Sequence, residues 1–433
     1  MTLIDARSIP ADPLSATRLE EAGFDYRLVG MDDPVAAGAF TQAVNRGFLG
    51  PAATDDEITW TAETWKARRN VGVYETGAAA DALPVATLNS WVAPATVPGG
   101  QIPMWAISVV TVAATHRRRG IARNLLEGEL RAAVATGVPI AGLTVSEATI
   151  YGRYGFGAAI PAARIAIDTG RAGWAGPREE GRLEYVAGEQ LASDLGEVHE
   201  RSRANRSGQI PGWETRWKTM AGLAAEEGKK NAGARGVRYL DADGELRGVM
   251  AYSMADQPGT FRSVLKIAHL AAQTDEAMRA LWGFAVNHDL VTRVEVDLRP
   301  IDDPIVHLVA DQRAVELTVH DHGWLRILDV PAALEARRYE GPAEAVVQVE
   351  DQYGFAAGTW QVRIGADGVA SVLPSDADPD VTLGVADLSA AYAGGVPLAQ
   401  LAAAGRVRGD ARVIGALSRA LRSGRAPLLG IWY

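Results

Sequence analysis

The chain has 433 residues, 48% of them hydrophobic and 22% charged, which is close to the average of folded globular proteins and excludes a disordered chain. At roughly 150 residues per domain, this length predicts two or three domains. The net charge of −10 argues against an extended nucleic-acid surface, and the lack of cysteine excludes a thiol nucleophile, disulfides and cysteine zinc sites. The N-terminus has no basic and apolar leader and no run of about 18 apolar residues occurs, so we expect a cytoplasmic protein without a membrane span.

Helix and strand patterns alternate through the first 170 residues. They predict, in chain order, helices at 34–46 and 55–69, strands at 71–74, 84–91 and 105–112, a helix at 121–136 and a strand at 140–145. The glycine-dotted segment 169–181 is typical of a linker. We therefore expect the first domain to end near residue 170.

The same order of elements returns in residues 171–318, which suggests a duplicated domain. The patterns predict helices at 189–204 and 213–225, strands at 237–240, 246–253 and 263–271, a helix at 275–287 and a strand at 291–298. Residues 319–433 form a third unit, with strands at 324–330, 344–349 and 358–364 and then Ala- and Leu-rich helices. Its last seven residues are apolar, and we expect them to be buried.

A basic loop joins the third predicted strand to the helix of the first domain. It reads Thr115-His116-Arg117-Arg118-Arg119-Gly120-Ile121-Ala122. A helix start presents unpaired N–H donors, glycine permits close approach of the backbone, and arginines supply charge, so the loop favours a phosphate ligand. The alternative is a solvated basic turn.

The corresponding place in the second domain differs in charge. Residues 272–277 contain no cationic side chain and no glycine, and the helix there starts with Asp275 and Glu276. An acidic helix start repels a pyrophosphate. We therefore expect one such site per chain, in the first domain.

Two motifs resemble the GNAT superfamily of N-acetyltransferases. Arg117, Gly120 and Ala122 occupy the places of its cofactor motif, which is Arg or Gln, two residues, Gly, one residue, Gly or Ala. After the next predicted strand, the run from Tyr151 to Phe156 fits the family's tyrosine, three residues, Gly, Phe. Each match alone is weak, but both occur in the right order on the right elements.

Longer runs resemble the Eis-like (enhanced intracellular survival) branch of that superfamily. They are residues 115–120, 146–147 with 150–153, and 324–327 with 330–337. The resemblance implies an α+β fold with two tandem GNAT domains, each a mixed central sheet flanked by helices, and a sterol-carrier-protein-like α+β domain at the C-terminus. The second GNAT domain would be degenerate. We place the three domains at residues 1–170, 171–318 and 319–433.

The resemblance also implies a site, a co-substrate and an assembly. The co-substrate is acetyl-CoA, without a metal; the acceptor is an amine; and members assemble as hexamers. The implied acetyl-CoA contacts are Val110, Thr111 and Val112 on the strand, Arg117, Arg118, Arg119, Gly120, Ile121, Ala122 and Arg123 at the loop and helix start, and Ser146 with Glu147.

Acetyl transfer to an amine needs a base and is helped by an acid. An amine of lysine type has a pKa of about 10.4, so its neutral form at pH 7 costs about 4 to 5 kcal/mol, and departure of the thiolate is eased by a nearby acid. The resemblance implies Tyr151 as the acid, with Tyr154 as its rival and a core tyrosine as the alternative. It implies the C-terminal carboxylate of Tyr433 as the base, and the alternative is a tail packed only for stability.

The sequence does not identify the acceptor amine. Aminoglycoside-acetylating members place acids where this chain has Gly47 and Trp432, so aminoglycosides stand beside polyamines, lysine side chains and arylalkylamines. An alternative from another class is a lipid- or ligand-binding protein that uses the C-terminal domain, with a regulatory acetyl-CoA site. The His320-Asp321-His322 run has the look of a metal pair, but such alternation is more often a solvated strand edge.

Overall fold

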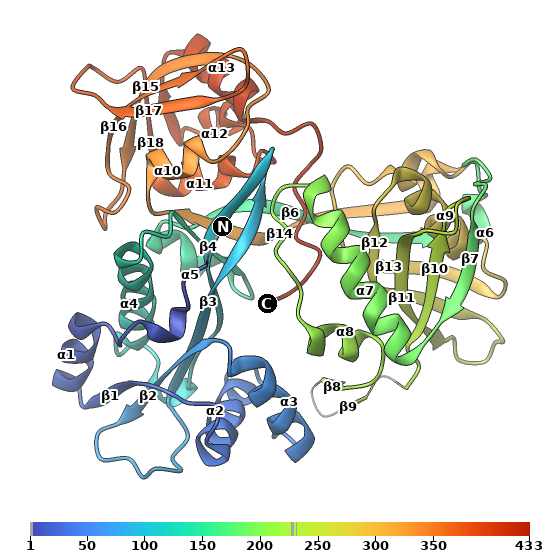
Figure 1. Cartoon of the computed structure of the whole chain (residues 1–433), viewed down its shortest axis with the longest axis horizontal. Coiled ribbons are helices and arrows are strands. Elements are labelled where there is room, and N and C mark those ends of the chain that lie inside the picture. Colours follow the sequence, from blue (N-terminus) through green and yellow to red (C-terminus); the bar gives the residue numbers. More distant parts are fainter. Residues whose placement is uncertain (1–2, 227–228, 231) are drawn as a thin grey trace. The chain divides into compact units, whose positions relative to one another are not determined.

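A computed structural model describes residues 3–226, 229–230 and 232–433 (Figure 1). By its internal contacts the chain divides into two units. The first unit comprises the described residues up to Ile160, together with Gly323–Gly424 and Tyr433. The second comprises Pro161–His322 and Arg425–Trp432.

The first unit is built on a mixed sheet that helices flank, as the sequence predicts. Its strands are, in sheet order, β1 (Phe24–Leu28), β2 (Arg69–Glu75), β3 (Ala86–Val97), β4 (Gly100–Val112), β5 (Ile140–Thr144) and the end of β14 (Val315–Ile327). All neighbours are antiparallel except β4 and β5, which are parallel. The helices of this region are α1 (Pro13–Glu21), α2 (Pro34–Gly47), α3 (Asp55–Trp65), α4 (Ile121–Ala135), the single turn α5 (Ala148–Tyr151) and the 3-10 turn Gly152–Tyr154 that continues it.

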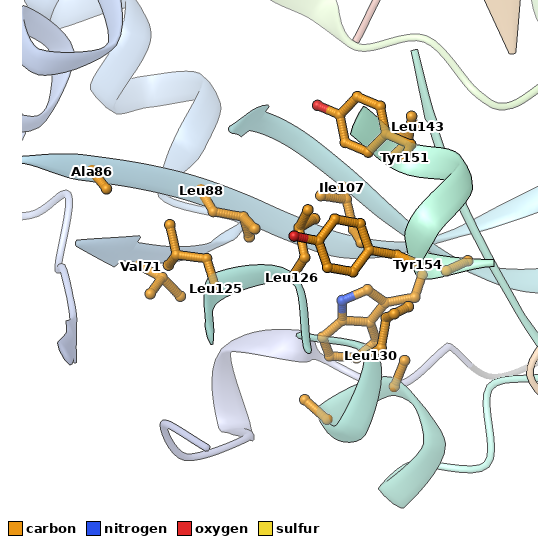
Figure 2. Packing of buried hydrophobic residues seen from close by; sticks show 14 of the residues in the cluster. Val71, Ala86, Leu88, Ile107, Leu125, Leu126, Leu130, Leu143, Tyr151 and Tyr154 are labelled. Atoms are coloured by element: carbon orange, nitrogen blue, oxygen red, sulfur yellow. The ribbon is translucent and has the colours of Figure 1, made fainter. Parts of the chain in front are cut away.

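Helix α4 is anchored to this sheet by one apolar face. Ile121, Leu125, Leu126 and Leu130 are at most 1% exposed and pack in a cluster with strand residues such as Leu88 (Figure 2). Burial of each such side chain stabilises the fold by about 1.5–3 kcal/mol. The packing fixes the start of α4 against the sheet.

Strand β4 carries a bulge close to its C-terminal end. Thr87 of β3 faces Thr111, whereas Asn89 faces Ser108, so Val109 and Val110 together oppose a single residue. Val109 has a φ of 46°, in the left-handed region that a β-branched residue rarely adopts. Since a bulge bends its strand, the end of β4 turns from the straight path. The parallel pairing with β5 runs only from Met104 to Ala106.

The second unit repeats this plan. Its sheet order is the end of β6 (Gly157–Asp168), then β13 (Val291–Arg299), β12 (Ser263–Ala272), β11 (Leu246–Asp256), β10 (Arg235–Leu240) and β7 (Arg182–Val186). Again one inner pair, β12 with β13, is parallel. The helices are α6 (Thr169–Ala172), α7 (Gly188–Ser202), α8 (Glu214–Met220) and α9 (Asp275–Val286), and a separate pair of short strands is β8 (Ala225–Glu226) and β9 (Lys229–Lys230).

A smaller sheet follows in the C-terminal region of the first unit. Its order is β17 (Ala370–Pro374), β16 (Gly358–Ile364), β15 (Ala343–Glu350), β18 (Val381–Gly384) and β19 (Val407–Gly409). The helices are α10 (Val330–Glu335), α11 (Val385–Tyr392), α12 (Leu398–Ala403) and α13 (Ala411–Leu421). They enclose an apolar cavity of only about 20 Å³.

Several element predictions need correction. The helix expected at 55–69 ends at Trp65, because Arg69 already begins β2. The strand expected from 324 begins at Val315, and the expected linker at 169–181 contains the turn α6. The sequence patterns also missed β1 and β6. The expected burial of the C-terminal residues is confirmed for Leu428, Leu429 and Ile431, whereas Trp432 is 44% exposed.

Candidate active site

A cavity of about 440 Å³ opens between the end of β4 and the start of α4. Most of the residues that the sequence singled out for acetyl-CoA line it. These are Val110, Thr111, Val112, Arg117, Arg118, Gly120, Ile121, Ala122, Arg123, Ser146 and Glu147. Tyr151 lines the same cavity. The structure therefore gathers the strand end, the basic loop and the candidate acid around one space.

The basic loop has the geometry of an anion site. Arg118 has a φ of 63°, a left-handed conformation that is rare for residues other than glycine and concentrates at functional sites. Gly120, with a φ of 81°, adopts the same region without strain. Gly120 is the N-cap of α4 and has no side chain to cap the first N–H groups. Those donors and the arginines fit a diphosphate.

Arg119 behaves differently from its neighbours. Its guanidinium lies 4.4 Å from the centre of the Phe24 ring, and it does not belong to the cavity lining. A cation over an aromatic face is a stabilising contact in its own right. The structure therefore separates Arg119 from Arg117 and Arg118.

Gly47 borders the cavity where α2 meets the end of β4. A Cβ atom at Gly47 would lie 2.3 Å from the Cβ of Thr111. The Thr111 hydroxyl is 2.7 Å from the Thr87 hydroxyl, and the latter donates to the carbonyl of Val109 at 2.8 Å. Because these bonds hold Thr111, a side chain at position 47 would fit only if Thr111 moved.

Tyr151 combines burial with access to the cavity. The residue is 7% exposed, and its ring meets Phe156 edge to face at a centroid distance of 6.1 Å. Burial raises the pKa of Tyr151 to about 12, and the negative charge of Glu147 adds to the shift. The phenol is therefore a protonated O–H donor at neutral pH.

Tyr154, the rival, occupies a different environment. It is 5% exposed, its ring lies among the labelled leucines in Figure 2, and it stacks on Tyr353 at 6.2 Å. Tyr154 does not line the cavity. The geometry favours Tyr151 as the group that meets a ligand.

Tyr433 lies at the end of β5. The hydroxyl of Thr144 donates to the terminal oxygen of Tyr433 at 2.6 Å, and the Tyr433 ring packs edge to face on Trp91 at 5.4 Å. Burial raises the pKa of the Tyr433 phenol. Tyr433 does not line the cavity. Its partner Thr144 is only two residues from Ser146, which does line the cavity.

Some residues of the cavity wall were not predicted. His116 of the basic loop lines it; one ring nitrogen lies 2.9 Å from a Glu75 carboxylate oxygen and the other 2.8 Å from the Thr115 hydroxyl. Phe48, which is 51% exposed, also lines it. Leu126 and Ile150 complete the wall. Their apolar spacing indicates only core, so the sequence carried no signal for them.

The corresponding place in the second unit is smaller and charge-balanced. A cavity of about 80 Å³ lies beside the start of α9. Tertiary structure brings Arg206, Arg299 and Arg425 to it, although the local segment has no cation. Arg425 is 3.0 Å from Asp275, and Arg206 and Arg299 also pair with aspartates. This space is far smaller than the cavity of about 440 Å³ in the first unit.

Within the described ranges, no cluster of three or more His, Asp or Glu side chains could hold a metal ion. His322 is buried, and its Nε2 lies 3.1 Å from the carbonyl oxygen of Ile431. Burial lowers the pKa of His322 to about 4, so the ring is neutral. Among the described helices, none is long and apolar enough to cross a membrane.

Family comparisons match the three parts of the chain. Residues 36–159 and 208–327 each match an acetyltransferase (GNAT) domain. Residues 330–430 match a sterol carrier protein domain. The second copy thus matches a GNAT domain in spite of its different loop.

Similar proteins share this arrangement over most of their length. An uncharacterised N-acetyltransferase of Streptomyces avermitilis is 37% identical over 392 residues, 87% of this chain and 92% of the relative. The N-acetyltransferase Eis of Mycobacterium tuberculosis is 31% identical over 72% of this chain and 76% of its own length. The crystal structure of Eis1 from Mycobacterium abscessus superposes with a TM-score of 0.81 at 28% identity. The superposition covers 95% of this chain and 100% of the Eis1 chain. The chain belongs to the Eis-like family of GNAT N-acetyltransferases, enzymes that depend on acetyl-CoA.

Proposed function

We propose that this enzyme moves the acetyl group of acetyl-CoA to a primary amine of a small molecule or of a lysine side chain. Tyr151 is the general acid, and the C-terminal carboxylate of Tyr433 is the general base. The observation that carries the proposal is the single cavity lined both by the basic loop and by Tyr151. Such a cavity brings the phosphate-binding end and the reacting end of one co-substrate together.

Each part of the cavity has a role in holding acetyl-CoA. Arg117, Arg118 and Arg123 neutralise the diphosphate, and the first N–H groups of α4 donate to it. The backbone of Val110, Thr111 and Val112 pairs with the pantetheine arm, as an added strand pairs with a sheet edge. Ser146 and Glu147 border the arm on its other side. The bulge at Val109 supports this role, because it bends β4 where the arm needs free backbone groups.

The acid acts on the leaving group. As the amine nitrogen forms a bond to the thioester carbonyl carbon, the bond between that carbon and sulfur breaks. The phenol proton of Tyr151 passes to the sulfur, so that coenzyme A leaves as a thiol. A pKa of about 12 keeps this proton in place at neutral pH.

The base acts on the amine. The carboxylate of Tyr433 accepts the proton that the amine nitrogen loses as it forms the new bond. Support comes from the 2.6 Å hydrogen bond of Thr144, which fixes the terminal oxygen at the end of β5. A fixed acceptor reduces the cost of about 4 to 5 kcal/mol for presenting a neutral amine.

The acceptor class stays broad. Gly47 carries no acid, a side chain there would collide with Thr111, and Trp432 stands where other members have an acid. A polycationic aminoglycoside lacks both charge partners here, so polyamines, lysine side chains and arylalkylamines are equal candidates. The rival proposal of a lipid carrier has little support, since a cavity of about 20 Å³ holds about one water molecule.

Three further properties belong to the proposal. We propose domain boundaries near residues 170 and 318, a homo-hexameric assembly and a cytoplasmic location. Sedimentation of the purified chain tests the assembly. A hexamer gives a mass of about six chains, and a monomer or dimer contradicts it.

The test of the activity is a coenzyme A release assay over a panel of amines. Tyr151→Phe removes only the phenolic O–H and should lower kcat by about 10²–10⁴-fold, the usual contribution of a general acid. Tyr154→Phe is the matched control, because it makes the same change in the neighbouring buried tyrosine. Equal activity of Tyr151→Phe and wild type on a good acceptor removes Tyr151 from this role.

A further inference from the structure

The turn that carries Tyr151 is too short to hold its own shape. Helix α5 has four residues and the following 3-10 turn has three. Isolated helical segments of this length are unstable, because the entropy lost in forming the first turn exceeds the free energy gained from its hydrogen bonds. The placement of Tyr151 therefore depends on what packs against the turn.

Part of that packing comes from the C-terminal domain. The loop between β15 and β16, residues 351–357, contacts the turn in two ways. The Gln352 amide donates to the carbonyl oxygen of Arg153. The Tyr353 ring stacks on Tyr154 at a centroid distance of 6.2 Å and an interplanar angle of 15°.

This loop is itself held rigidly. One Asp351 carboxylate oxygen accepts from the amide of Tyr353 at 3.1 Å, and the other accepts from the amide of Ala356 at 2.9 Å. The same carboxylate pairs with Arg326 at 2.7 Å, with both side chains 0% exposed. Arg326 also donates to the carbonyl oxygen of Tyr154 at 3.1 Å. Hence one buried ion pair fixes both the loop and the end of the turn.

Tyr353 also packs on the side of α4, against the buried cluster that includes Leu126 and Leu130. Burial raises the pKa of Tyr353, and the negative charge of Glu127 of α4 adds to the shift, so the phenol lies near that carboxylate. Glu127 lies 3.1 Å from Arg18 and 3.5 Å from Arg123, which lines the cavity. The ring of Tyr353 thus stands between the helix of the basic loop and the turn of Tyr151.

We propose that Tyr353, on the β15–β16 loop of the C-terminal domain, is a positioning residue for acetyl transfer that holds the Tyr151 turn against α4. The inference rests on the proposed role of Tyr151. Through Tyr353, the sterol-carrier-like domain would support the active site of its own chain, and this role requires no bound lipid. A misplacement of about 1 Å at a reacting group can lower the rate by up to about 10²-fold. Tyr353 can therefore affect the rate of acetyl transfer without contacting the substrate.

The test compares two changes at one position. Tyr353→Ala removes the ring and should lower kcat about tenfold, with a smaller change in the KM for acetyl-CoA. Tyr353→Phe keeps the stack and should retain at least about half of the wild-type kcat. Tyr339→Phe is the control: it deletes a buried hydrogen bond to the carbonyl of Leu334 inside the same domain and should leave kcat unchanged. A normal kcat for Tyr353→Ala, or an equal loss in Tyr339→Phe, overturns the inference.

A second measurement is independent of turnover. Amide hydrogen exchange of residues 148–156 should speed up in Tyr353→Ala and stay unchanged in Tyr339→Phe. If Tyr353→Ala does not fold, Gln352→Ala replaces it, since the Gln352 side chain is exposed and its loss affects only the bond to Arg153. If wild type acetylates no amine, the proposed function fails and exchange alone decides the inference. Unchanged exchange at the turn overturns it.

Discussion

Replacing Gly47 by alanine tests how tightly the cavity wall is built. The new Cβ would lie 2.3 Å from the Thr111 Cβ and 2.5 Å from its methyl carbon, well inside contact distance. Thr111 cannot turn aside without breaking its bond to Thr87. Overpacking of this kind costs about 1–3 kcal/mol. If about 1.4 kcal/mol of the strain falls on the end of β4, acetyl-CoA binding weakens about tenfold.

The assay is titration calorimetry with acetyl-CoA, together with urea unfolding. Gly38→Ala in the same helix is the control, because its Cβ would meet nothing closer than 3.9 Å and alanine favours a helix by up to about 1 kcal/mol. Gly47→Ala should lose both affinity and stability, whereas Gly38→Ala should lose neither. Affinity and stability equal to wild type in Gly47→Ala would refute the steric reasoning.

Three more predictions concern the loop, the base and the acid. Arg118→Ala should raise the KM for acetyl-CoA about tenfold, as expected for a lost charged contact worth about 1.5 kcal/mol. Arg119→Ala should change the KM little, because Arg119 lies over an aromatic ring. Equal effects of the two substitutions in steady-state kinetics would contradict this difference. Appending one glycine after Tyr433 moves the carboxylate and should lower kcat while calorimetry finds acetyl-CoA binding nearly intact; unchanged turnover excludes the base. The pKa of Tyr151 is raised from 10.0 to about 12, so the folded state retains its proton longer: the associated stability is complete below pH 10 and is lost as the pH rises towards 12. In urea unfolding, wild type should therefore lose stability relative to Tyr151→Phe above pH 10, and parallel curves contradict the shift.

The sequence could indicate which candidate site residues lie together where these residues are close in the chain. Arg117, Gly120 and Ala122 lie within six consecutive residues. The strand, the loop and the helix follow one another in the chain, so the residues on them come together through chain connectivity. Tyr151 comes just after the strand that pairs with β4. The repeated order of elements in the two copies was predicted from short-range periodicity, whereas the mixed sheets were implied by the family resemblance.

Contacts between distant segments could not be predicted. Gly47 and Thr111 approach each other across 64 positions, and neither shows a pattern that reveals it. The bulge at Val109 needs a partner strand to define it. Tyr353 and Tyr154 come from different domains, and the arginines of the second unit gather from three separate segments. Such features follow from packing, and only the folded chain displays them.

We propose that one cavity holds the diphosphate at the start of α4 and the thioester beside Tyr151. A crystal structure with coenzyme A bound tests this arrangement. We expect diphosphate density against Gly120 and the arginines, the pantetheine along residues 110–112 and the sulfur within hydrogen-bond reach of the Tyr151 hydroxyl. Coenzyme A bound in the second unit, or with its sulfur at Tyr154 instead, would contradict it.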